Sequence, residues 1–231
     1  MGKIISIVNQ KGGVGKTTTA VNLTAALREQ GLRVLLCDFD PQANASSGLG
    51  VDKRKRKQSV YDALINGVDP KSLIVTTKYG DVLPSSSDLA GATVELIATE
   101  SREKQLKNVL ERLRSDYDVI LVDCPPSLEM LTLNGLCACD GILVPVQCEY
   151  FALEGLSDLM STLRTVKRRM NPDLEIFGVL LTMYDGRTNF CAQVAQEVRR
   201  HFPGKVFATV IPRNVRLAEA PSHGIPVTVY D

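Results

Sequence analysis

The stretch that decides the fold reads Gln10-Lys11-Gly12-Gly13-Val14-Gly15-Lys16-Thr17-Thr18. An apolar run at residues 4–8 precedes it, and a helical pattern of apolar residues over 17–30 follows it. A strand, a glycine-rich turn and a helix N-terminus form a phosphate cradle, because the glycines let backbone N–H groups converge on anionic oxygens and the helix dipole adds to the attraction. The sequence therefore predicts a phosphate-binding loop at this point of the chain.

The side chains of the loop predict a nucleoside triphosphate and a metal ion. Lys16 would neutralise the β- and γ-phosphates, and the Thr17 hydroxyl would take a ligand position on Mg²⁺. The usual pattern has glycine where Gln10 stands, and a second lysine, Lys11, starts this loop. Two ammonium groups repel unless several negative charges lie between them, which a triphosphate supplies. A glycine-rich turn with solvated lysines is the weaker alternative. We expect nucleotide contacts from Lys11, Gly12, Gly13, Val14, Gly15, Lys16, Thr17 and Thr18.

The segment Lys11–Thr17 resembles the deviant Walker A motif of the ParA/MinD family of P-loop ATPases. Four further segments resemble the family in the expected order across the whole chain. They are the second strand with switch I at 34–42, the Walker B strand with switch II at 119–127, and two segments typical of the chromosomal ParA (Soj) branch at 145–155 and 211–222.

Strand-like runs alternate with helical patterns along the chain. The runs lie at 4–8, 34–38, 118–123, 141–146, 176–182 and 206–211, with helical patterns at 17–30, 102–115, 152–170 and 190–201. This alternation predicts an α/β fold with a doubly wound, mainly parallel sheet, which the resemblance identifies as the P-loop NTPase (Rossmann-like) fold. We expect one domain over residues 1–231. Similar proteins continue for about one more helix, so we expect that this chain lacks the family's C-terminal helix.

Composition limits the other classes of function. The 27 Lys and Arg residues against 26 Asp and Glu give no bulk attraction to nucleic acid, so any such binding must come from a local patch. No apolar run approaches the roughly 20 residues that a membrane span needs. The start Met1-Gly2-Lys3-Ile4 leads directly into a strand, so we expect no signal peptide and a cytoplasmic protein.

The cysteines are predicted to be buried structural thiols, because most lie within or beside apolar runs. They are Cys37, Cys124, Cys137, Cys139, Cys148 and Cys191. An iron–sulfur relative, the nitrogenase iron protein, belongs to the same superfamily, but the sequences around Cys124 and Cys137 do not match it.

Hydrolysis of ATP needs a stabilised γ-phosphoryl charge, a held Mg²⁺ and a water placed in line. Asp123 ends an apolar strand, where a carboxylate can reach the metal at the carboxyl edge of a parallel sheet. The resemblance implies that Asp40 orients the attacking water and reaches the metal, and that Asp38 supports the magnesium surroundings. The alternative for Asp38 and Asp40 is a strand-end carboxylate that caps the next turn. The predicted metal-binding residues are Thr17, Asp40 and Asp123, and the predicted catalytic residues are Lys11, Lys16 and Asp40.

The resemblance also implies a nucleotide-dependent homodimer. Lys11 would reach the phosphates of the other subunit, and Gly12 would let two backbones approach closely. Hydrolysis would remove the charge that holds two Lys11 side chains together, so the protein would act as a slow nucleotide clock. For the base, the resemblance points to Pro212 and Asn214 near the adenine and to Glu149 near the ribose.

DNA binding is the output that the resemblance implies, through Arg187 and Arg216. The ATP dimer would bind nucleoid DNA without sequence preference, and a ParB-like partner would stimulate hydrolysis. The basic run at residues 53–57 is either a solvated loop or a further surface for DNA or an acidic partner. Two other functions stay open. A MinD-like membrane switch needs a C-terminal amphipathic helix, which nothing after Pro226 offers, so we expect no membrane partner. A cargo-positioning ATPase would use the same machinery.

Overall fold

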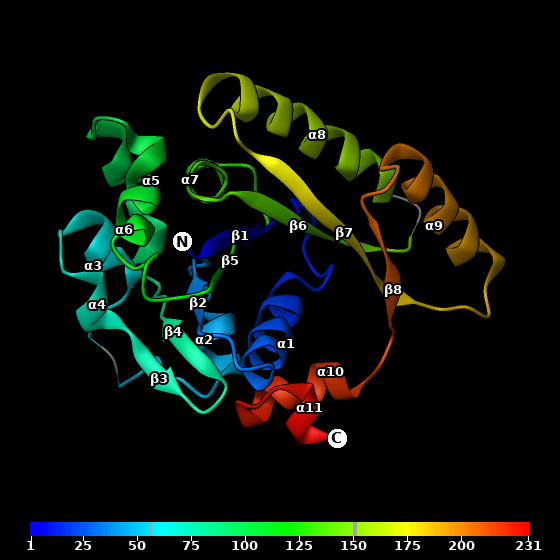
Figure 1. Cartoon of the computed structure of the whole chain (residues 1–231), viewed down its shortest axis with the longest axis horizontal. Helices are drawn as coiled ribbons and strands as arrows, with labels where there is room; N and C mark the ends of the chain where they lie inside the picture. The colour runs from blue at the N-terminus through cyan, green and yellow to red at the C-terminus, as the bar shows by residue number, and fades with distance from the viewer. Residues whose placement is uncertain (56, 150–151) are drawn as a thin grey trace.

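The computed structural model describes residues 1–55, 57–149 and 152–231. Its centre is a sheet of eight strands in the order β3-β4-β2-β5-β1-β6-β7-β8 (Figure 1). The strands are β1 (Lys3–Ile7), β2 (Val34–Asp38), β3 (Val75–Thr77), β4 (Gly80–Leu83), β5 (Val119–Asp123), β6 (Gly141–Gln147), β7 (Glu175–Tyr184) and β8 (Val206–Pro212). Neighbouring strands run parallel except β3 with β4. The predicted doubly wound, mainly parallel sheet is confirmed.

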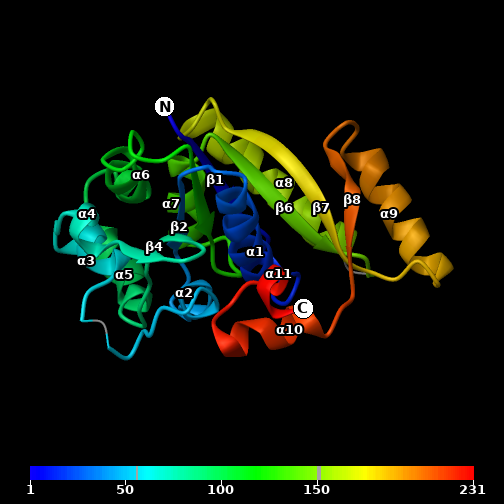
Figure 2. The same cartoon turned by 60° about the horizontal axis from the view of Figure 1, so that its bottom comes forward.

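Helices cover both faces of the sheet (Figures 1 and 2). Their bounds are α1 (Lys16–Glu29), α2 (Asn44–Gly48), α3 (Val60–Ile65), α4 (Pro70–Leu73), α5 (Leu89–Glu95), α6 (Gln105–Glu111), α7 (Met130–Ala138), α8 (Ala152–Arg169), α9 (Asn189–His201), α10 (Arg216–Glu219) and α11 (Val227–Tyr230). Short 3₁₀ turns occupy Leu96–Ala98, Arg102–Lys104 and Ala220–His223.

The strands explain the two layers, because successive side chains point to opposite faces. Ile4 and Leu35 pack in one hydrophobic cluster with α3 and α5 to α9, whereas Ile5 and Leu36 pack in the other with α1 and α2. The side chains on both faces of the central strands are buried, and these strands are therefore apolar along their whole length. The six cysteines are free and buried, as predicted.

The sequence patterns missed several short elements. The β3–β4 hairpin has strands of three and four residues, too short to give a clear alternation. Helix α7 is buried nearly all round, so it shows no polar face by which a helical period can be recognised. The pattern at 102–115 is an α-helix only over α6, with a 3₁₀ turn before it.

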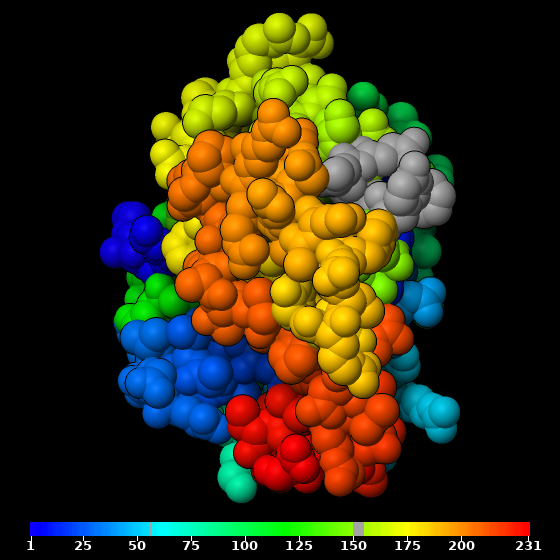
Figure 3. Space-filling view, turned by 90° about the vertical axis from the view of Figure 1, so that its right-hand side faces the viewer, coloured from blue at the N-terminus to red at the C-terminus, as the bar shows by residue number. Residues whose placement is uncertain are grey.

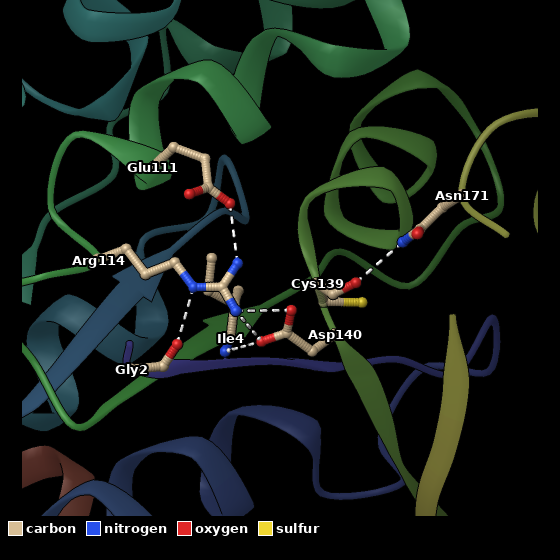
Figure 4. A network of polar contacts seen from close by, with 7 residues as sticks. All are labelled: Gly2, Ile4, Glu111, Arg114, Cys139, Asp140 and Asn171. Atoms are coloured by element: carbon tan, nitrogen blue, oxygen red, sulfur yellow. Dashed lines mark hydrogen bonds and ion pairs between the residues drawn. The ribbon is translucent and has the colours of Figure 1, made fainter. Parts of the chain in front are cut away.

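A polar network fixes the amino edge of the sheet (Figure 4). The Arg114 guanidinium donates to the Gly2 carbonyl at 2.9 Å and to both Asp140 carboxylate oxygens at 2.7 and 2.8 Å. Asp140 in turn accepts the backbone N–H of Ile4 at 2.9 Å. These bonds join the start of β1 to the start of β6. They therefore fix how far the two strands are shifted along each other, and with it the relative position of their carboxyl ends. Among the described helices, none is long and apolar enough to span a membrane.

Candidate active site

Three central strands end at the same level. Ile7 of β1 and Asp38 of β2 are both register partners of Asp123 in β5. The glycine-rich loop leaves β1 at this edge and leads directly into α1. Parallel strands therefore bring the loop and two of the predicted acidic residues together, at the edge where parallel α/β sheets bind ligands.

The loop backbone has the conformation that a phosphate cradle needs. Gly13 and Gly15 have φ values of 76° and 92°, which residues with a Cβ atom rarely adopt. Gly15 stands at the N-cap of α1, and the first helical turn contains no acidic residue. The N–H groups at this helix end are therefore available to an anion.

Three long-range contacts hold the loop in place. The Asn9 amide donates to the Pro145 carbonyl in β6 at 2.8 Å, and the Thr182 hydroxyl of β7 donates to the Val14 carbonyl at 2.8 Å. The Gln10 amide donates to the Asp158 carboxylate in α8 at 3.2 Å. The sequence did not predict these tethers. For the Gln10 contact, the one sequence signal was that glutamine stands where the usual phosphate-loop pattern has glycine.

The two loop lysines have different partners. Lys16 is 6% exposed, and its Nζ donates to the Lys11 carbonyl at 2.9 Å. Burial lowers the pKa of Lys16, and the negative charge of Asp123 opposes this shift. The Lys11 ammonium instead forms an ion pair with Glu149. A Cβ added at Gly12 would meet no atom within 4 Å, so this side of the loop is open.

The acidic residues form a buried group. Asp123 is fully buried, and neither of its carboxylate oxygens has a hydrogen-bond partner among the described residues. Burial, and next the charge of Asp38, raise the pKa of Asp123 well above its usual value, whereas Thr17 and Lys16 lower it. Burial raises the pKa of Asp38 to about 6, against two hydrogen bonds of 2.7 Å from Ser46.

Asp40 lies beside this group, 9% exposed, and accepts the backbone N–H of Gln42 at 2.9 Å. Its own N–H donates to Asp38 at 3.3 Å. The carboxylate of Asp40 thus caps the next turn, the alternative considered from the sequence, and still adjoins the buried acids.

The residues present fit Mg²⁺. The unpartnered oxygens of Asp123 and the nearby Thr17 are the oxygen ligands that Mg²⁺ takes, with substrate phosphates and water completing the shell. No described group of three or more His, Cys, Asp or Glu side chains could hold a metal by itself.

A cavity of about 340 Å³ lies beside the start of α1. It is lined by Gly15 and Thr18 on one side and by Pro212 and Asn214 on the other. The structure therefore brings the two predicted base-contacting residues to the phosphate loop. Glu149 does not line this cavity, because its carboxylate pairs with Lys11.

The two predicted DNA-binding arginines follow the carboxyl ends of β7 and β8, and both are ion-paired within the chain. Arg187 donates through Nε and Nη2 to Asp185 at 2.9 and 2.8 Å. Arg216 pairs with Glu219 at 3.2 Å and with Asp231 at 3.4 Å.

Two predicted segments are only partly described. In the basic run at 53–57, Lys53 Nζ donates to the Gln42 carbonyl at 2.9 Å, and Arg56 lies outside the described residues. In the segment at 145–155, Tyr150 and Phe151 lie outside them.

Comparison with known proteins identifies relatives of this chain. The family described as "AAA domain" matches residues 2–176. The chain is 57% identical to the sporulation initiation inhibitor protein Soj of Bacillus subtilis, with 100% of this chain and 92% of Soj covered. It is 51% identical to the chromosome partitioning protein ParA of Myxococcus xanthus, with 100% and 82% covered.

A solved structure agrees with the geometry. The crystal structure of cobyrinic acid a,c-diamide synthase from Mycobacterium smegmatis with bound ADP and magnesium has a TM-score of 0.88 and 41% identity, over 97% of this chain and 93% of that one. Its ligands correspond to the nucleotide and metal expected here. The full-length identity to ParA and Soj proteins places the chain in the ParA/MinD family of P-loop ATPases, in its ParA (Soj) branch.

Proposed function

We propose that this chain is a DNA-partitioning ATPase whose ATP-bound form is a sandwich dimer. The observation that carries the proposal is the different placement of the two loop lysines. Lys16 is buried against its own loop, whereas Lys11 is held by Glu149 beside the open face at Gly12. On release from Glu149, this second loop lysine would serve the phosphates of a second copy that approaches the open face.

Hydrolysis would use the residues of the carboxyl edge. Lys16 and the N–H groups at the start of α1 would bind the phosphates, and Thr17 and Asp123 would hold Mg²⁺. The ion, when bound, neutralises charge that develops on the phosphate oxygens. Asp40 would orient the attacking water, which makes it the residue on which turnover depends. Pro212 and Asn214 would contact the base in the adjoining cavity.

The output would be release from DNA. Dimerisation doubles the number of arginines that face one duplex, and DNA affinity rises steeply with the number of phosphate contacts. Arg187 and Arg216 would contact phosphates and therefore read no sequence. Hydrolysis, stimulated by a ParB-like partner, would separate the dimer and release it from the nucleoid.

The test compares the parent chain with Asp40→Ala. With ATP, both should elute as dimers in size-exclusion chromatography with light scattering, and both should bind a labelled duplex. ADP should leave monomers that do not bind. The Asp40→Ala dimer should persist because it cannot hydrolyse ATP. A chain that stays monomeric in both forms, or a variant that hydrolyses ATP at the parent rate, would contradict the proposal.

The alternatives have their own readouts in the same assay. Vesicles with anionic lipid that sediment the ATP form while DNA does not would favour a MinD-like membrane switch. Nucleotide-dependent dimers that bind neither DNA nor vesicles would favour a cargo-positioning ATPase.

A further inference from the structure

A groove lies between α8 and α9 at the amino edge of the sheet, opposite the active site. Two adjoining cavities of about 330 and 210 Å³, both lined by Met160 and Arg164, make up this groove. The larger cavity is mainly apolar, with buried Leu163 and Leu174, and the smaller one places buried Phe202 beside polar Ser157. Figure 3 shows α8 and α9 side by side on this face of the molecule.

The rim of the groove is basic. Arg164 and Lys167 of α8, His201 of α9 and Lys205, which precedes β8, line it. All four are exposed. No acidic side chain of the described part of the chain forms an ion pair with Arg164, Lys167 or Lys205.

Few acidic groups face this surface. Glu175 lines one end of the groove, and Glu197 of α9 lies 3.9 Å from Arg200. Three further cations of the same two helix ends, Arg168, Arg169 and Arg199, are exposed as well. The surface around the groove therefore carries a clear excess of positive charge in a chain whose net charge is only +1.

Helix dipoles explain part of this pattern, because cations in the last turn of a helix are stabilised by the carbonyl ends. They do not explain Arg164, which precedes the last turn of α8, or Lys205, which lies outside both helices. They also do not explain why apolar side chains lie open beneath the cations. The occurrence of basic and apolar side chains in one groove therefore needs a cause other than the helix dipoles.

We propose that this groove docks an acidic amphipathic helix of a partner protein. Apolar side chains of that helix would contact Met160 and its neighbours on the floor, and its carboxylates would pair with the rim cations. Methionine adapts to varied apolar partners, which suits such a floor. DNA would use the rim but would gain nothing from an apolar floor, and a flat lipid surface would not enter a depression between two helices.

The location makes the docking independent of the nucleotide. The groove lies at the amino edge, whereas the phosphate loop and both predicted DNA-contacting arginines lie at the carboxyl edge. A partner could therefore remain attached through the ATP and ADP forms. The inference does not depend on the proposed DNA function, because its predicted binding needs neither ATP nor DNA.

The test selects peptides from a displayed library of 18-residue helical sequences. The parent chain is the target, and Arg164→Glu/Lys167→Glu is the counter-target. We expect enriched peptides to carry apolar residues at positions i, i+3, i+4 and i+7, with Asp and Glu flanking them. Their affinity for the counter-target should be lower by about tenfold or more, as for the loss of central charge pairs.

A matched control is Lys78→Glu/Lys107→Glu, which makes the same charge change at two exposed lysines on other elements. It should bind the selected peptides like the parent chain, and Met160→Asp should weaken them without altering the rim. ATP and ADP should give equal affinities. Circular dichroism shows whether each variant is folded.

Three results would overturn the proposal. One is a selection that yields no peptide dependent on Arg164 and Lys167. Another is an Arg164→Glu/Lys167→Glu variant whose DNA affinity falls while the control's does not, which would make this a DNA surface. The third is groove-dependent binding to phosphatidylglycerol vesicles, which would make it a lipid surface.

Discussion

The carboxyl edge of the sheet and the α8–α9 groove differ in whether their cations are paired within the chain. At the carboxyl edge, Lys11, Lys16, Arg187 and Arg216 each have an acceptor within the chain. At the amino edge, the rim cations of the α8–α9 groove have no ion-pair partner in the described residues. A ligand of the four carboxyl-edge cations competes with a contact inside the chain. A ligand of Arg164, Lys167 or Lys205 in the groove competes with no ion pair of the described residues.

The largest expected effect comes from Lys16→Ala. The variant should lose ATP binding by about a hundredfold or more, because the cradle loses the one cation that is buried within it. Isothermal calorimetry with ATP and Mg²⁺ measures the loss. Lys78→Ala is the control for a lysine of the surface. Micromolar affinity in Lys16→Ala would show that the nucleotide does not use this loop.

The second largest effect is expected for Gly12→Val, which should prevent dimerisation and leave ATP binding unchanged. A Cβ added at Gly12 meets no atom of its own subunit within 4 Å, so ATP affinity should stay near the parent value. A second copy that approaches this face would meet a branched side chain, and the dimer should be lost. Light scattering with ATP decides: a normal Gly12→Val dimer would contradict the sandwich arrangement.

The sequence predicted the site as far as local pattern determines it. The loop and the helix after it, expected over 17–30, follow from one contiguous strand–turn–helix unit, and the strand-end position of Asp123 follows from a separate apolar run at 118–123. The tether from Thr182 to Val14 joins residues far apart in sequence, and no local pattern marks it. The pairing of Lys11 with Glu149 and the groove lined by Met160 likewise depend on the order of strands in the sheet. That order is known only from the positions of β6, β7 and β8 in the structure.

Acidity at the carboxyl edge gives the third prediction. Burial raises the pKa of Asp38 from its ordinary 3.8 to about 6, so the folded chain holds a proton there that the unfolded chain has released. The contribution of Asp38 to the free energy of unfolding should therefore fall by about 3 kcal/mol as pH rises from below 4 to above 6.

The measurement is urea unfolding in the absence of Mg²⁺, for the parent and for Asp38→Asn, from pH 4 to pH 7.5. Asp118 and Asp185 act with the opposite sign, since arginine partners lower the pKa of each carboxyl to about 2. Both remain in the variant, so the difference between the two curves reports Asp38 together with its effect on Asp123, whose pKa the charge of Asp38 raises. A difference that stays constant with pH would show that Asp38 is charged throughout.

The smallest expected effect concerns the internal pair at Arg187. In the free protein, Asp185 accepts from both the Nε and the Nη2 of Arg187, so DNA phosphates must compete with a carboxylate for the same guanidinium. Asp185→Asn should remove this competition and raise the DNA affinity of the ATP form by about twofold to fivefold, because the pair is exposed to solvent and therefore weak. Fluorescence anisotropy with a labelled duplex measures the gain. In an Arg187→Ala background the same substitution should have little effect, since the guanidinium that it frees is absent. An equal gain in both backgrounds would mean that removing a negative charge near the DNA suffices, and Arg187 would then have no direct part in the contact.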